Sequence, residues 1–415
     1  MIAPDRRRLL KTLAGLPLLG LLPQACATAP AVDSGLGPIR RAGWSGAAGA
    51  TSGRTVIMIE MFGGNDGLNT VVPYRDPKYA ALRPGIAVAR TDIIRIDGEL
   101  GYHPALAPAM TLWERGEMAT VLGVGYANPN RSHFRSQEIW ETAADSDEVL
   151  TEGWLGRATA EHPVFRHRRA DAEAVALGNG SLGALLGRGA RVVTMNDPRQ
   201  YIRDAQRLAD VSQAAATPAL AHLVKTHGDA LATAAALRHK IEMRKRFEGK
   251  LPGDALGRSL ANAVALLDAG VDVPVIKVTH SGFDTHANQP GRHENLLRQL
   301  AGSVAALGDA LRQIGRWGDT LVFAYSEFGR RAAENNSKGT DHGTAGVAFF
   351  FGGRVAGGTH GRQPSLDHLT EGDLNFNVDF RRLYATLLAN WWGQRDNFLT
   401  AREHQPLPLF RAAVA

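Results

Sequence analysis

The sequence predicts an α/β protein with a doubly wound, mostly parallel sheet and helices on both faces. Short apolar, β-branched runs alternate along the chain with longer helical patterns, as expected where crossover helices connect parallel strands. With 415 residues, 44% of them hydrophobic, the chain can bury one large core or two moderate ones. Its 46 glycines and 20 prolines fall mostly at the ends of these runs, which favours many strand-to-helix connections over a fibrous or low-complexity protein.

The amino terminus predicts an export signal over residues 1–27. A twin arginine, Arg6 and Arg7, precedes a mildly apolar stretch over residues 12–22, which is too short to span a bilayer comfortably. The segment resembles a twin-arginine (Tat) signal, which implies export of the folded protein to the periplasm by the Tat translocase. An ordinary secretory signal or a basic tail is the alternative interpretation.

Cys26 is the only cysteine of the chain. Cleavage after Ala27 would remove it, and otherwise Cys26 would carry a lipid anchor. In both cases no thiol is left for a cysteine nucleophile, a disulfide or a thiolate metal site. We expect no transmembrane span in the mature chain.

The charge balance does not point to nucleic acid. The signal contains four basic residues and one acidic residue, so that without it the net charge is +3 rather than +6. The densest basic run, residues 166–169, is short and is interpreted as a solvated loop. A nucleic-acid partner would require a clustered basic stripe, and we therefore predict none.

A linker rich in proline, alanine and glycine covers residues 28–53, and residues 54–415 are predicted to form one α/β domain. Short apolar runs predict strands over residues 55–61, 118–124, 174–177, 191–195, 273–278, 321–325 and 347–351. Periodic apolar patterns predict helices over residues 104–114, 132–142, 218–246, 257–268, 292–317 and 379–392. The stretch 146–250 is expected to be a helical elaboration of this domain.

Three polar clusters adjoin the ends of these strands. Residues 283–288 follow the strand at 273–278, residues 326–330 follow the strand at 321–325, and residues 340–344 precede the strand at 347–351. Ligands of open parallel sheets bind at the edge where strands end. Carboxylates and imidazoles gathered at one edge indicate divalent metal chemistry.

These motifs make the family recognisable. The chain resembles the bacterial domain-of-unknown-function 1501 family of exported proteins, which is allied to the alkaline phosphatase and sulfatase superfamily. The resemblance runs from Thr55 onward and is carried by residues 63–73 (GGNDGLNTVVP), 131–134 (RSHF), 283–288 (FDTHAN), 326–330 (SEFGR) and 341–343 (DHG). It implies an alkaline-phosphatase-like fold and hydrolysis of a phosphate or sulfate ester with one or two divalent ions, without distinguishing Zn, Mn, Mg and Ca.

The resemblance also implies which residues hold the metal. The first ion would take Asp284, His286 and His342, although Asp284 and His286 are two positions apart where the superfamily usually has four, and His280 is a rival ligand. The second ion would take Asp66 and Glu327. The histidine that usually follows the second acid is replaced by Phe328, so that Asp341 would complete this site or only one ion would bind.

Each of these residues also has an ordinary structural interpretation. Asp284 is suited to capping the turn before a helix, and His286 to a hydrogen-bonded surface position. Asp66 lies in an Asn-Asp-Gly turn. Glu327 directly follows an apolar strand, where a buried carboxylate needs a cation; Arg330 or Arg331 would serve as well as a metal.

The nucleophile is expected in the loop before the helix at 132–142. Sulfatases that use formylglycine carry Cys or Ser two positions before the proline of this loop, and Ala127 stands there instead, which disfavours that chemistry. Ser132 is therefore the expected nucleophile, with His133 beside it and Arg131 available to an oxyanion. The alternatives are that Ser132 only caps the helix or that a metal-activated water attacks.

Two functions are compatible with these observations. The first is an exported, metal-dependent hydrolase acting on a small-molecule or polymeric phosphate or sulfate ester. The second is a non-catalytic exported binding or assembly protein that retains the superfamily fold.

Overall fold

The computed structural model describes residues 53–162, 165, 170–178, 180–187, 190–207, 217–241 and 251–411. All of them belong to one unit, Ala47–Ala415. The predicted export signal with Cys26, the linker up to residue 52 and the basic run 166–169 lie outside the described residues. Within the described ranges, no helix is both long and apolar enough to cross a membrane.

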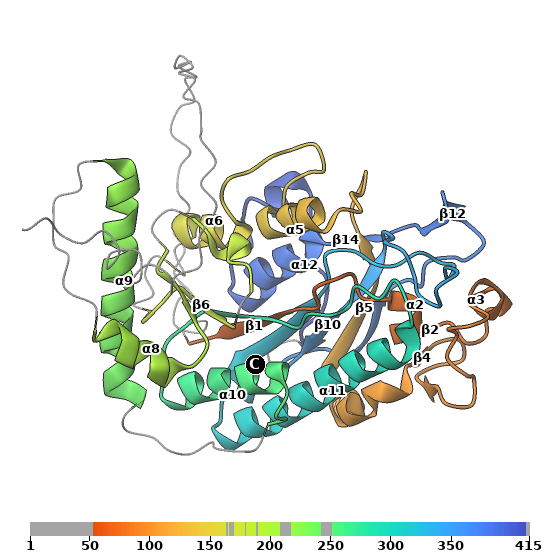
Figure 1. The fold of residues 1–415 in the computed structure, drawn as a ribbon, viewed down its shortest axis with the longest axis horizontal. Coiled ribbons are helices and arrows are strands. Elements are labelled where there is room, and N and C mark those ends of the chain that lie inside the picture. Colours follow the sequence, from red (N-terminus) through yellow and green to blue (C-terminus); the bar gives the residue numbers. More distant parts are fainter. Residues whose placement is uncertain are drawn as a thin grey trace, which may run out of the picture. The chain divides into compact units, whose positions relative to one another are not determined.

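A nine-stranded sheet forms the centre of the described structure (Figure 1). In spatial order its strands are β11 (Gly358–Gly361), β5 (Met118–Gly125), β10 (Gly346–Phe351), β9 (Thr320–Tyr325), β1 (Thr55–Glu60), β8 (Val275–Thr279), β6 (Ala174–Leu177) and β7 (Val192–Met195), with β14 (Val378–Asp379) also paired to β5. Only β10 runs antiparallel to its neighbours; the other pairings are parallel. The predicted mostly parallel α/β sheet is confirmed.

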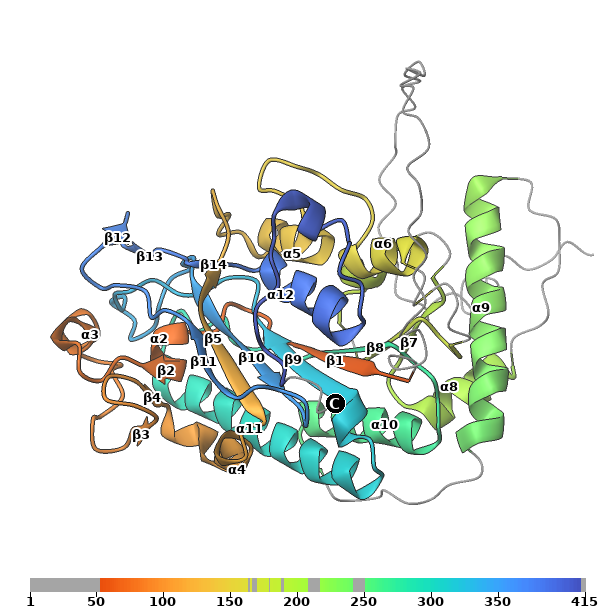
Figure 2. The same cartoon turned by 180° about the vertical axis from the view of Figure 1, so that it is seen from behind.

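Helices cover both faces of this sheet, as Figures 1 and 2 show. One face carries α10 (Ala255–Asp268), α11 (Gln289–Gln313) and the 3-10 helix η1 (Pro104–Ala109) with α4 (Met110–Glu114). The opposite face carries α5 (His133–Thr142), α6 (Trp154–Glu161) and α12 (Arg381–Thr386). The side chains of β1 alternate between the two resulting cores, with Ile57 and Ile59 in the first and Val56 and Met58 in the second.

Smaller elements surround the sheet. They are α2 (Gly67–Thr70), α3 (Pro77–Leu82), α8 (Pro198–Ala205), α9 (Pro218–Ile241), a three-stranded sheet of β2 (Val71–Val72), β4 (Gly101–Tyr102) and β3 (Ile94–Arg95), and the pair β12 (Leu369–Thr370) and β13 (Asp373–Leu374). Short helical turns occur at η2 (Gly183–Leu185), η3 (Trp317–Asp319) and η5 (Thr400–Arg402). The stretch expected as a helical elaboration, 146–250, also supplies β6 and β7 to the main sheet.

Two predicted helices are interrupted. The helix predicted over 104–114 starts as the 3-10 helix η1 and becomes α-helical only at Met110, because Pro108 lacks an N–H for the helical ladder. The helix predicted over 379–392 is α-helical over Arg381–Thr386 and continues as a π-helix, η4 (Leu387–Trp391).

Strand direction decides which loops meet. Since β10 is antiparallel to both β5 and β9, β5 runs in the same direction as β9, β1 and β8. The carboxyl ends of these four strands therefore share one edge, and β10 begins at that edge. The loops that follow the four strands and the loop that precedes β10 converge there.

Candidate metal centre

Three histidines and an aspartate come together at this edge of the sheet. Asp284 and His286 lie in the loop between β8 and α11, and His133 is the first residue of α5. His342 precedes β10, where its backbone forms a bridge to Arg330. Together these residues are called the histidine cluster.

The donor atoms of the histidine cluster gather around Asp284 Oδ1, and those of His133, Asp284 and His342 all lie within 4.8 Å of one another. Asp284 Oδ1 lies 3.0 Å from His286 Nε2, 3.1 Å from His342 Nε2 and 3.5 Å from His133 Nε2. The Nε2 atoms of His286 and His342 are 2.9 Å apart. A tetrahedral zinc ion with bonds of about 2.0–2.1 Å separates its donor atoms by about 3.3 Å. The spacing of His133, Asp284 and His342 therefore fits one such ion, and His286 Nε2 lies next to two of these donors.

The other ring nitrogen of each histidine faces an oxygen. His133 Nδ1 lies 2.8 Å from Glu327 Oε1, His342 Nδ1 lies 2.7 Å from the Arg131 carbonyl, and His286 Nδ1 lies 3.3 Å from Asp341 Oδ1. A proton on each Nδ1 satisfies these acceptors and leaves the Nε2 lone pair free. Metal-binding histidines are held in this way.

His133 Nε2 supplies an independent indication of a missing partner. This nitrogen is buried and makes no hydrogen bond among the described residues. An unpaired buried polar atom costs free energy. A cation at the centre of the histidine cluster would provide the partner, so the residues present fit a bound metal.

Arg330 holds the loops and the aspartate in place. Its buried guanidinium donates to the carbonyls of Gly63, Gly64, Phe283 and Thr340, and to Asp284 Oδ1 at 2.7 Å. Burial opposes ionisation of Asp284, but the Arg330 and His342 hydrogen bonds outweigh it and lower its pKa to about 2. Asp284 is therefore an anion at neutral pH.

The electrostatic environment tunes the imidazoles differently. The hydrogen bond to Glu327 raises the pKa of His133. Burial lowers the pKa of His342, so that its neutral form, which can donate a lone pair, is favoured. The carboxylates of Asp284, Glu327 and Asp341 contact the three imidazoles, with Arg330 bonded to Asp284 and Arg331 acting on Asp341 through its charge.

Asp66 is not brought into the histidine cluster. Its carboxylate caps α2 by accepting from the N–H groups of Leu68 and Asn69, receives a hydrogen bond from Gln289, and forms a fully buried ion pair of 2.5 Å with Arg83. Burial opposes ionisation, and Arg83 nevertheless lowers the pKa of Asp66. Arg83 thus takes the place of the cation expected for this acid.

Glu327 and Asp341 lie behind the histidine cluster. Glu327 accepts from the N–H groups of Gly63 and Gly64 at 2.9 and 3.3 Å in addition to His133. Neither Arg330 nor Arg331, the alternative partners expected from sequence, is bonded to it; Arg330 binds Asp284 instead. The Asn335 hydrogen bond and then His286 lower the pKa of Asp341. Both acids orient imidazoles.

Of the residues expected at the nucleophile, only one places its side chain in the histidine cluster. His133 joins the histidine cluster. The Arg131 guanidinium is paired with Asp373, and only its carbonyl reaches the cluster through His342. Ser132 is exposed at the start of α5, and its hydroxyl makes no capping hydrogen bond.

His280, the rival ligand, lies elsewhere. Its Nε2 is 3.0 Å from the Leu296 carbonyl, and it is buried. Sequence reasoning did not assign His133 as a ligand. The available signal was that His133 begins the helix that follows the predicted strand 118–124, while Asp284 lies in the loop that follows another strand.

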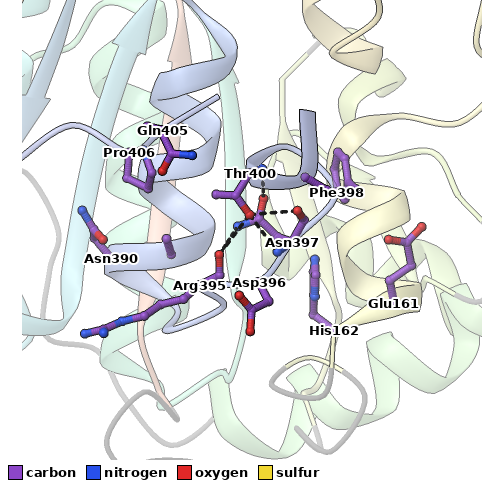
Figure 3. Close-up of a pocket in the computed structure, with 12 residues that line it drawn as sticks. Glu161, His162, Asn390, Arg395, Asp396, Asn397, Phe398, Thr400, Gln405 and Pro406 are labelled. Atoms are coloured by element: carbon purple, nitrogen blue, oxygen red, sulfur yellow. Dashed lines mark hydrogen bonds between the residues drawn. The ribbon is translucent and has the colours of Figure 1, made fainter. Parts of the chain in front are cut away.

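Figure 3 shows a cavity of about 890 Å³ that is lined by other residues. No residue of the cluster lines it. Its wall is formed by the end of α6, by the end of η4 and by the segment that leads into and follows η5, with Asn397 hydrogen-bonded to Thr400. It is therefore not part of the candidate metal centre.

The family described as protein of unknown function (DUF1501) matches residues 99–401, so the chain belongs to this family. No curated protein matches the chain.

Solved structures with a similar fold have low identity. A protein in the alkaline phosphatase superfamily from Vibrio parahaemolyticus is 9% identical, with 86% of this chain and 71% of that chain covered and a TM-score of 0.40. The PsFucS1 sulfatase from Pseudoalteromonas sp. is 11% identical, with coverages of 86% and 70% and a TM-score of 0.38. The C-terminal periplasmic domain of EcEptC from Escherichia coli, in a complex with Zn, is 9% identical, with coverages of 74% and 74% and a TM-score of 0.35.

Proposed function

We propose that this member of the DUF1501 family is an exported hydrolase of phosphate or sulfate esters that depends on one divalent metal ion. The observation that carries the metal is that three imidazole Nε2 atoms gather around the Asp284 carboxylate, each imidazole being oriented through its Nδ1. The choice of an ester substrate follows from the resemblance of the sequence motifs to the superfamily.

The donor set favours zinc over the harder cations. Three imidazole nitrogens and one carboxylate oxygen suit zinc and related transition metals, whereas Mg²⁺ and Ca²⁺ prefer oxygen ligands. We propose one ion rather than two, because Asp66 is neutralised by Arg83 and Glu327 is occupied by His133 and two backbone amides.

When bound there, the ion would supply a Lewis acid for the ester and activate water. Hydrolysis breaks the bond between the bridging oxygen and phosphorus or sulfur, and water provides the hydroxyl for that atom and the proton for the leaving alcohol. Asp284 and the three histidines would hold the ion, while Glu327 and Asp341 would fix the rings. Ser132 is the proposed nucleophile of the alternative two-step route, since its hydroxyl is exposed next to His133.

We propose the same route of export as the sequence predicts: a twin-arginine signal over residues 1–27, passage through the Tat translocase to the periplasm, and either cleavage after Ala27 or a lipid anchor at Cys26. The proposed substrate is a small-molecule or polymeric ester.

One observation favours a non-catalytic role instead. Four protein donors would complete a tetrahedral zinc ion, which is typical of structural sites, whereas catalytic sites keep one position open. Asp284 and His286 are half-exposed, so solvent reaches this side of the histidine cluster. Activity measurements decide between the two roles.

The test measures metal content and turnover on the same preparations. Purified mature protein should contain about one zinc-type ion per chain, and His133→Ala, His342→Ala and Asp284→Ala should lose it. The matched control is His368→Ala, which removes an exposed histidine outside the cluster. Full metal retention in all three cluster variants would contradict the proposed centre.

Turnover is assayed with para-nitrophenyl phosphate, its bis-ester and para-nitrophenyl sulfate. We expect metal-dependent hydrolysis of at least one, lost in the cluster variants and kept in His368→Ala. Ser132→Ala should retain metal, and its rate shows whether the hydroxyl attacks. A full complement of metal without turnover of any ester would support the non-catalytic role.

A further inference from the structure

A second buried polar group lies where α5, the helix that begins at His133, packs on the sheet. Lys277, in the middle of strand β8, is 1% exposed, and Glu60, the last residue of β1, is 2% exposed. Lys277 Nζ lies 3.3 Å from Glu60 Oε2 and 3.2 Å from Glu141 Oε1. It also donates to the Ser181 carbonyl at 2.8 Å.

Helix α5 presents one polar stripe to this group and to the histidine cluster. His133, Gln137 and Glu141 are spaced four residues apart and therefore lie on one face of the helix. His133 contacts Glu327 at 2.8 Å. Gln137 Nε2 donates to Glu60 Oε1 at 3.3 Å, and Glu141 accepts from Lys277.

The partners of the stripe lie on adjacent strands. Glu327 follows β9, Glu60 ends β1, and Lys277 lies in β8, in the order in which these strands pair. His133, Gln137 and Glu141 thus contact, in this order, groups at three successive strands of the sheet. A rotation of α5 about its axis would break all three contacts together.

Apolar contacts also hold α5, because Ile139 and Trp140 are buried in the second core and Trp140 stacks on Tyr325 and Phe380. The amino terminus of α5 has no side-chain cap, and Ser136 Oγ adds one hydrogen bond of 2.6 Å to the Glu327 carbonyl. Burying Glu60 and Lys277 is costly unless they are paired. This cost makes the rotation of α5 that pairs them strongly preferred.

We infer that Lys277, Glu60, Gln137 and Glu141 position His133: they set the rotation of α5 on the sheet and thereby place the His133 imidazole in the metal centre. They are positioning residues, since none of them belongs to the histidine cluster. The inference rests on the proposed function for its metal and deepens it by adding residues outside the ligand set.

The test compares zinc affinity with stability. Glu60→Gln with Lys277→Met removes the two most deeply buried charges at once and leaves Glu141, whose side chain is 12% exposed, as the remaining acid of the group. Zinc affinity is measured by competition with a chelator, and thermal unfolding is measured on the metal-free protein. We expect affinity to fall about 10–100-fold, as for other groups that orient ligands. The matched control, Glu117→Gln with Arg312→Met, removes an ion pair between the residue before β5 and α11 and should keep wild-type affinity.

Gln137→Met provides a second variant if the double variant does not fold. Gln137 is half-buried and neutral, so its loss leaves no unpaired charge, and we expect a smaller decrease in zinc affinity. Affinity within about twofold of wild type in a folded variant, with the control also unchanged, would overturn the inference.

A wild-type protein that binds no zinc would overturn the proposed function, and the positioning role would then be decided by crystal structures of the metal-free proteins. Loss of the contact between His133 Nδ1 and Glu327 Oε1 in the double variant, with the sheet unchanged, supports positioning. Retention of that contact at 2.8 Å overturns it.

Discussion

His293 is a buried histidine whose role is structural. It lies on α11, is almost fully buried, and its Nε2 is 2.9 Å from Asn65 Oδ1. Burial lowers its pKa to about 4 from an ordinary value of 6.5. The folded state therefore keeps it neutral at pH values where the unfolded chain takes up a proton.

This difference makes stability depend on pH. Because the unfolded state binds more protons below pH about 6.5, the His293 contribution is complete above that pH and is lost as the pH falls toward about 4. Between pH 7 and pH 5 we expect the free energy of unfolding to fall by about 2 kcal/mol more in the wild type than in His293→Gln. Denaturant unfolding at both pH values measures this difference. An equal fall in the free energy of unfolding in the two proteins would contradict it.

At the scale of single residues, the sequence predicts the site residues that lie in a loop next to the end of a predicted strand. Asp284, His286 and His342 meet as expected because their loops adjoin the carboxyl edge. Asp66 was not predictable in the same way, since its partner Arg83 comes from the end of α3 through a separate packing contact. His133 joins the cluster only because β10 pairs with β5.

At the scale of elements, the glycine turn after β1 decides how closely the loops approach. Gly63 has φ +118°, and a Cβ there would overlap the backbone of Phe283 and Asp284. Its N–H also donates to Glu327. The glycines of the segment 63–67 can be read from the sequence, whereas the loop that this turn touches cannot, because that contact joins segments far apart in the chain.

Gly63→Ala should therefore disturb both stability and the metal centre. We expect at least about 2 kcal/mol of destabilisation, because backbone atoms cannot move aside as a side chain can, and weaker zinc binding because Asp284 shifts. Gly98→Ala is the control, since a Cβ there meets nothing within 4 Å. Denaturant unfolding and zinc competition measure the two effects. Wild-type stability of Gly63→Ala would show that the turn is less constrained than the structure indicates.

Helix and strand boundaries were predictable where one periodic pattern dominates. The strand Ala174–Leu177 has the predicted ends, and α11 starts three residues earlier than the predicted helix at 292. The change to a π-helix at Leu387–Trp391 could not be predicted from the sequence, because apolar residues on one face are compatible with either kind of helix.

At the scale of the whole molecule, the sheet lies between two hydrophobic cores, and the candidate metal centre lies at the carboxyl edge of its strands. The α/β class and the covered faces followed from the alternation of strands and helices. The antiparallel insertion of β10 between β5 and β9 did not, because pairing between strands far apart in sequence leaves no local pattern. That insertion is what brings His342 next to His133.

Anomalous X-ray diffraction from crystals grown with zinc tests the central claim most directly. We predict an anomalous peak among Nε2 of His133, His286 and His342 and Oδ1 of Asp284, at about 2.0–2.1 Å from its ligands. A crystal that shows the four side chains as described, with zinc absent from their centre or bound only elsewhere, would contradict the account.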